Sequence, residues 1–199
     1  WNGEVSSSAA HGRLRIEVFS GSEDRFHVTL LSGTTGFFTQ SIPTTGGLSD
    51  LCSGSWHHYA FAFDTSIEGD ATSYVPSIDF YVDGVCVETN IIPSGRNPGG
   101  PQGHTGGGIG VITGSLISNI GSLRAAPSGS LEGTADSELA LEGYGKLSAS
   151  LDEFRFWKKA RNSTQVGRFY NAQVGAGANT NIENSSLGIY YKFNEGVTG

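Results

Sequence analysis

The chain contains no methionine, only two cysteines and few charged side chains, and these shortages exclude several classes of protein. Its 12 lysines and arginines are outnumbered by 19 acidic residues, and they form no sustained positive stripe of the kind that binds a nucleic-acid backbone. No apolar run approaches the roughly 20 residues that a membrane-spanning helix needs. We therefore expect a folded chain that neither binds nucleic acid nor spans a membrane.

The two cysteines, Cys52 and Cys86, lack the Cys-x-x-Cys spacing of a zinc site. If the strands that begin at Trp56 and Ile78 pair in antiparallel fashion, the two thiols come near each other. A disulfide is then one interpretation, and two small buried side chains are the other. The sequence leaves both open.

Short segments in which apolar and polar residues alternate predict β-strands along most of the chain. The predicted strands are 13–19, 26–31, 37–42, 56–63, 78–82, 85–89, 151–157 and 187–193. In the first of them, Leu14, Ile16 and Val18 share one face. This pattern predicts an all-β chain with one face of each strand buried.

The pair of strands at 56–63 and 78–82 is the most informative stretch. Tyr59, Phe61 and Phe63 share one face of the first strand, and Asp83-Gly84 after the second is a hairpin-turn signal. Between the two strands we expect an acidic loop, 64–77. The aromatic side chains predict a sandwich core.

Only one short helix is expected, near 163–170, where Asn162 can cap the first turn and Gln165 can complete a capping box. Gly167 weakens this helix, so packing must hold it. Much of 93–150 is rich in glycine, and it predicts loops with one or two strands.

Five motifs, in this order, resemble the LamG-like jelly-roll family of the concanavalin A-like lectin/glucanase superfamily. They are Trp56-His-His58 with Asp64, Phe80-Tyr-Val-Asp-Gly84, Leu151-Asp-Glu-Phe-Arg-Phe-Trp157, Tyr170-Asn171 and Tyr190-Tyr-Lys-Phe-Asn-Glu-Gly196. The resemblance spans about 13–196 and implies a two-sheet antiparallel jelly-roll sandwich, with 1–199 as a single domain. The ending Lys192-Phe-Asn-Glu-Gly196 on a Gly- and Thr-rich, methionine-free chain also resembles the LamG-like modules in large structural proteins of tailed phages, especially cyanophages. The absence of methionine, together with the opening at Trp1, leads us to expect a piece of a longer chain.

The resemblance also implies a calcium site, since laminin G and pentraxin relatives often hold Ca²⁺ at a rim of the sandwich. Asp64, Glu68 and Asp70 lie on the predicted loop, and carboxylate oxygens are the ligands that calcium prefers. A solvated acidic loop is the alternative interpretation.

No catalytic residue is predicted. Glycanases of the superfamily carry a Glu-x-Asp-x-x-Glu motif, which this chain lacks. Asp152-Glu153 and His57-His58 are adjacent pairs, and adjacent strand residues point to opposite faces.

The expected function is that of a non-catalytic recognition or structural module in a larger extracellular or virion-surface protein. Its partners would be glycans or neighbouring protein subunits, including copies of itself. The alternative function is that of a glycan-cleaving hydrolase. A sugar site needs an exposed aromatic ring beside polar groups, for which Tyr74, Tyr144 and Tyr190 are candidates. Packing within the fold is the alternative interpretation of each, and the sequence does not choose among them.

Overall fold

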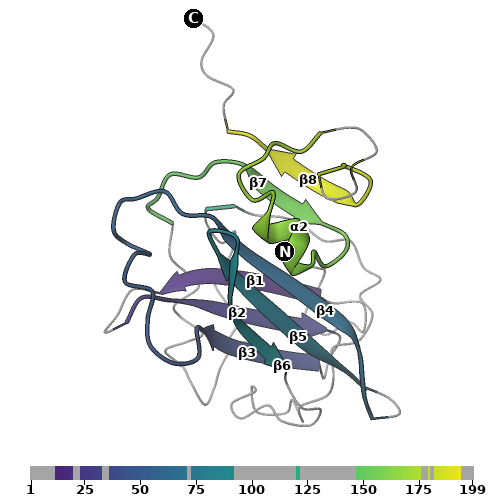
Figure 1. The fold of residues 1–199 in the computed structure, drawn as a ribbon. Coiled ribbons are helices and arrows are strands. Elements are labelled where there is room, and N and C mark those ends of the chain that lie inside the picture. Colours follow the sequence, from purple (N-terminus) through teal and green to yellow (C-terminus); the bar gives the residue numbers. More distant parts are fainter. Residues whose placement is uncertain are drawn as a thin grey trace, which may run out of the picture. The chain divides into compact units, whose positions relative to one another are not determined.

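In a computed structural model, the residues that the structure describes form mainly antiparallel strands with one short helix (Figure 1). The structure describes residues 12–19, 23–32, 36–70, 73–91, 120–121, 147–175, 179 and 182–193. Their elements are β1 (Gly12–Phe19), β2 (Arg25–Ser32), β3 (Gly36–Ile42), β4 (Tyr59–Asp70), β5 (Ser73–Val82), β6 (Val85–Ile91), β7 (Phe154–Trp157), α2 (Ser163–Gly167) and β8 (Leu187–Tyr191). The prediction of mainly antiparallel strands with a short helix after Asn162 is confirmed for the described residues.

Contacts within the chain divide it into two compact units. The first contains Trp1–Ser55, Thr65–Ser77 and Asn90–Leu147, and the second contains Trp56–Asp64, Ile78–Thr89 and Ser148–Gly199. Strands β1 to β3 belong to the first unit, and β7, α2 and β8 belong to the second. No helix among the described residues has the length and apolar content to cross a membrane.

In the first unit, β1, β2 and β3 form an antiparallel sheet in that order (Figure 1). Ile16 lies opposite Val28 and Val18 lies opposite Phe26, so the predicted apolar face of β1 continues across the sheet. Val28 is fully buried, whereas Ile16 and Val18 remain 39% and 41% exposed. The alternation identified the face correctly, but it could not show that β1 is an edge strand and therefore less covered.

The opposite face of this sheet is polar and nevertheless partly covered. Arg15 is buried and forms an ion pair of 2.6 Å with Glu17, and His27 is buried and hydrogen-bonds the Ser41 hydroxyl at 3.0 Å. Burial lowers the pKa of His27, and the nearby cations Arg25 and Arg15 lower it further. The buried polar row was not predicted, because alternation marks a polar face as solvent-exposed.

Strands β4, β5 and β6 form the second antiparallel sheet. The predicted loop 64–77 is wrong, because β4 continues to Asp70 and β5 already begins at Ser73. The predicted start at Trp56 is also wrong: β4 begins at Tyr59, and Trp56 is 69% exposed. Polar residues occupy this extension of the hairpin, and the sequence pattern therefore suggested a loop.

The aromatic face of β4 packs as predicted. Phe80 of β5 is fully buried, and its ring lies 6.4 Å from Tyr59 and 5.0 Å from Phe61. Tyr59, Phe61 and Phe63 are partly buried. They contribute to one side of the strand pair, where each is partly covered.

The other side of β4 and β5 forms a small core with helix α2. Ala62, Tyr81 and Val166 are buried together, and Ala60 packs against them. Burial raises the pKa of Tyr81 to about 12, and the neighbouring Asp79 contributes to the rise. Val166 therefore anchors a helix that is only five residues long.

The Asp83-Gly84 turn is confirmed, since both residues have positive φ, 48° and 80°. A side chain at Gly84 would place its Cβ 2.5 Å from the Tyr170 ring, and one at Gly167 would approach the Gly84 carbonyl oxygen to 2.9 Å. Gly167 thus weakens the helix but permits this close approach. The capping box of Asn162 with the first turn of α2 is present as predicted.

Strands β7 and β8 pair in antiparallel fashion, with Phe154 opposite Tyr191 and Arg155 opposite Tyr190. Strand β7 is shorter than the predicted strand 151–157 because Glu153 has φ 52°, which breaks the extended backbone before Phe154. Strand β8 likewise ends at Tyr191, before the predicted end at 193.

Both interpretations of the cysteines are wrong. Cys52 and Cys86 are free thiols, and both are exposed.

Candidate functional site

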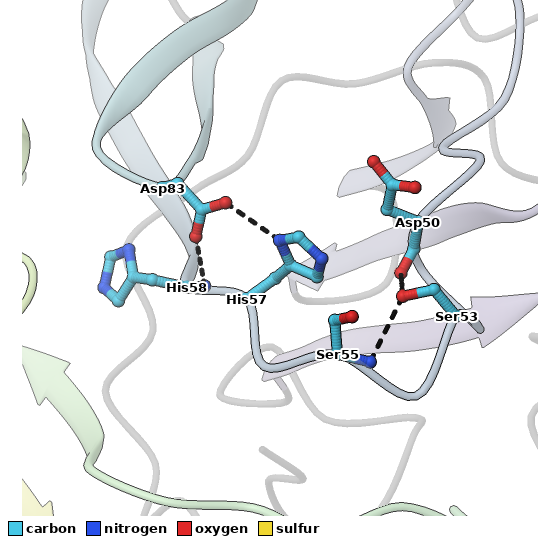
Figure 2. A network of polar contacts seen from close by, with 6 residues as sticks. All are labelled: Asp50, Ser53, Ser55, His57, His58 and Asp83. Atoms are coloured by element: carbon cyan, nitrogen blue, oxygen red, sulfur yellow. Dashed lines mark hydrogen bonds and ion pairs between the residues drawn. The ribbon is translucent and has the colours of Figure 1, made fainter.

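The adjacent histidines are tied to the hairpin turn by one carboxylate. The backbone N–H of His58 donates to Asp83 Oδ1 and His57 Nδ1 donates to Asp83 Oδ2, both at 2.8 Å (Figure 2). The hydrogen bond from His58 lowers the pKa of Asp83 most, and the bond from His57 adds to it. Asp83 is therefore an ionised acceptor, and this arrangement fixes the turn.

The predicted calcium ligands lie on a strand and not on a loop. Asp64, Glu68 and Asp70 belong to β4, although the side chains of Glu68 and Asp70 lie outside the described part of the chain. A strand rises about 3.3 Å per residue, so the backbone separates Asp64 from Glu68 by about 13 Å. That spacing does not suit a single ion, and the calcium site stays a prediction. Within the described ranges, no group of three or more potential metal ligands is found.

A polar network occupies one face of β7 and β8. Glu153 Oε2 accepts hydrogen bonds from Arg155 at 2.7 Å and from the Tyr190 hydroxyl at 2.5 Å, and the Arg155 guanidinium lies 5.4 Å from the Tyr190 ring centre. Burial favours a higher pKa for Glu153, but the hydrogen bonds from Arg155 and Tyr190 outweigh it and lower the pKa. Burial and the bond to Glu153 raise the pKa of Tyr190. Among the tyrosines named as sugar-binding candidates, Tyr190 therefore already donates its hydroxyl hydrogen bond within the chain.

The opposite face of the same strands carries exposed aromatic rings. Tyr191 is 49% exposed and Phe193 is 45% exposed, and their ring centres are 5.9 Å apart with an angle of 30° between the planes. The Phe154 ring lies 6.5 Å from that of Tyr191. We call Phe154, Tyr191 and Phe193 the aromatic patch. Phe193 has φ 53°, a conformation that bulky residues rarely adopt and that often marks a functional position.

The sequence interpretation missed this patch. Alternation places Tyr190 and Tyr191 on opposite faces, but it cannot say which face is covered. The tyrosine run identified the segment, and sugar binding by any of its rings stays a prediction. Of the other candidates, Tyr144 lies outside the described residues, as does the side chain of Tyr74 in β5.

Comparison with protein-family models, with curated proteins and with solved structures gives no match for this chain. The candidate function must therefore be argued from the site itself.

Proposed function

We propose that the chain is a non-catalytic recognition module with a LamG-like jelly-roll fold, which belongs to a larger extracellular or virion-surface protein and binds glycans. The observation that carries the proposal is the aromatic patch. Two neighbouring exposed rings, whose planes are inclined by 30°, offer an apolar surface on which a sugar face can stack. Isolated exposed aromatic residues are ordinary, but adjacent rings of this kind are typical of binding surfaces.

Asp83 and Glu153 do not suit the acid role that the hydrolase alternative requires. A glycosidase needs a general acid whose pKa is raised. Asp83 and Glu153 both have lowered pKa values, and each carboxylate is already occupied by hydrogen-bond donors. A reducing-sugar assay on polysaccharides gives a direct test. If the chain releases reducing sugar and this activity disappears when one acidic residue is changed, the proposed function is wrong and the chain is a hydrolase.

The binding test uses the full chain on a glycan array and in polysaccharide pull-downs. We expect Tyr191→Ala and Phe193→Ala each to weaken glycan binding by about tenfold or more, which corresponds to about 1.4 kcal/mol. Trp56→Ala is the matched control, because Trp56 is an exposed aromatic residue outside the patch. If Trp56→Ala lost glycan binding and the patch variants did not, the glycan site would not lie at β8.

Measuring the mass of the chain in solution separates adhesion from assembly. If the chain binds no glycan but self-associates through the patch, the proposal of glycan recognition is wrong and docking to neighbouring subunits replaces it. Repeating the binding assay with a calcium chelator tests the expected Ca²⁺ dependence of the family.

A further inference from the structure

A small cavity of about 50 Å³ lies beside helix α2, entirely within the second unit. Its polar wall is formed by His58, Arg155, Arg161 and Gln165, and its apolar wall includes Val166 and Phe169. A buried water needs about 10–15 Å³, so the cavity has room for a few waters or for one small organic anion.

Two nitrogen atoms of this wall lack hydrogen-bond partners. His58 Nδ1 and Arg155 Nε are buried, and neither makes a hydrogen bond within the described residues. Buried polar atoms are nearly always bonded, and an exception points to a water or an ion that completes the site.

The wall also carries two guanidinium groups, and both are held in place. Arg155 is fixed by its 2.7 Å ion pair with Glu153, and the Arg161 guanidinium lies 4.0 Å from the centre of the Trp157 ring. Burial lowers the pKa of Arg161; Glu183 opposes this effect and Arg155 reinforces it. The guanidinium groups of Arg155 and Arg161 therefore offer N–H donors to an anion in the cavity.

We propose that this cavity binds a small carboxylate, with oxygens that accept from His58 Nδ1, Arg155 Nε and the Arg161 guanidinium. The planar, two-oxygen form of a carboxylate matches the donor geometry of guanidinium groups. The apolar wall beside Val166 and Phe169 suits a short alkyl group, which favours acetate over an inorganic anion. The site does not depend on the glycan proposal.

Binding should also change the titration of His58. Burial lowers the pKa of His58, Arg155 on β7 lowers it further, and Asp83 at the hairpin turn opposes them. The Tyr170 ring, 5.4 Å from His58, faces it from the segment after α2. A bound carboxylate introduces a negative charge beside the imidazole, so the pKa of His58 should rise on binding.

The experiment is an NMR titration of the full chain with sodium acetate, with sodium chloride at equal ionic strength as the reference. We expect saturable shifts of the His58 ring signals and the Arg155 Nε–H signal with acetate only, and a higher pKa of His58 at saturation. Sodium glucuronate forms a second arm. If only acetate binds, the ligand of the cavity is a free small anion. If glucuronate binds equally well or more tightly, the ligand is the carboxylate end of a larger molecule.

Arg161→Gln should weaken acetate binding by about tenfold or more, because it removes one charge and keeps the polar character. Arg168→Gln is the matched control, since Arg168 is exposed and does not line the cavity. His58→Gln provides a second test that leaves both arginines in place. Equal shifts with chloride, or acetate binding unchanged in Arg161→Gln, would overturn the proposal and leave a cavity that contains only water.

Discussion

Replacing Asp83 with asparagine tests how the hairpin turn is held. Asparagine tolerates the left-handed backbone at φ 48° and keeps an oxygen for the N–H of His58, but it removes the charged acceptor of His57. A hydrogen bond to a charged group contributes about 1.5–3 kcal/mol. The Asp83 side chain is 43% exposed, and solvent screening reduces this to about 1–2 kcal/mol. For a chain of this size, each kcal/mol lowers the melting temperature by about 2–4 °C.

The effect should depend on pH in a defined direction. The pKa of Asp83 is lowered in the folded state, below its value of about 3.9 in an unfolded chain. The stabilisation by its charge is therefore fully present above about pH 4, and it is lost as the pH falls through the folded-state pKa. The difference between the wild-type chain and Asp83→Asn should be largest near neutral pH and should shrink in acid.

Urea unfolding followed by circular dichroism, in steps from pH 7 to pH 3, measures this difference. Asp50→Asn is the matched control, because it removes the same charge from an exposed aspartate. Equal stability of Asp83→Asn and the wild-type chain at pH 7, or a deficit that is undiminished at pH 3, would refute the assignment of Asp83 as the ionised acceptor of the turn.

Three further predictions concern single positions. Gly84→Ala should lower the free energy of unfolding in urea by about 3 kcal/mol or more, since it combines positive φ with a clash against a neighbouring tyrosine ring. Gly54→Ala, at φ 81° and with no atom of the described residues near its Cβ, should lower it by only about 1–2 kcal/mol. Equal costs would contradict the packing of the turn. Asn162→Ala should lower the free energy of unfolding by about 1 kcal/mol through loss of the capping box, and an unchanged value would mean that the cap contributes nothing. Cys52 and Cys86 should both react with a thiol reagent in the native chain, and a count of fewer than two reactive thiols would show that one is covered or oxidised.

The elements that the sequence predicted correctly are those specified by local chemistry. Alternation located β1 to β3, the dipeptide Asp83-Gly84 specified its own turn, and Asn162 with Gln165 specified the start of α2. Each of these signals lies within a few residues and needs no knowledge of distant packing.

The errors arise where distant packing decides the outcome. The polar segment after Phe63 forms a strand because β5, its partner in the hairpin, pairs with its backbone N–H and C=O groups. An apolar face is not the reason. Arg15 is buried because Glu17 pairs with it and other residues cover that face, which alternation reads as solvent-exposed. Exposure of Tyr191 rather than Tyr190 likewise depends on which face of β8 the rest of the chain covers.

The two proposals are separable because strands have a two-residue period. Arg155 and Tyr190 form a directly opposed pair on one face of β7 and β8, and Phe154 and Tyr191 form the next pair, on the other face. Removing the Tyr191 ring should therefore weaken glycan binding and leave acetate binding intact, while Arg161→Gln should do the reverse. If either single change abolished both activities, the two sites would not be independent, and their assignment to opposite faces of β7 and β8 would be wrong.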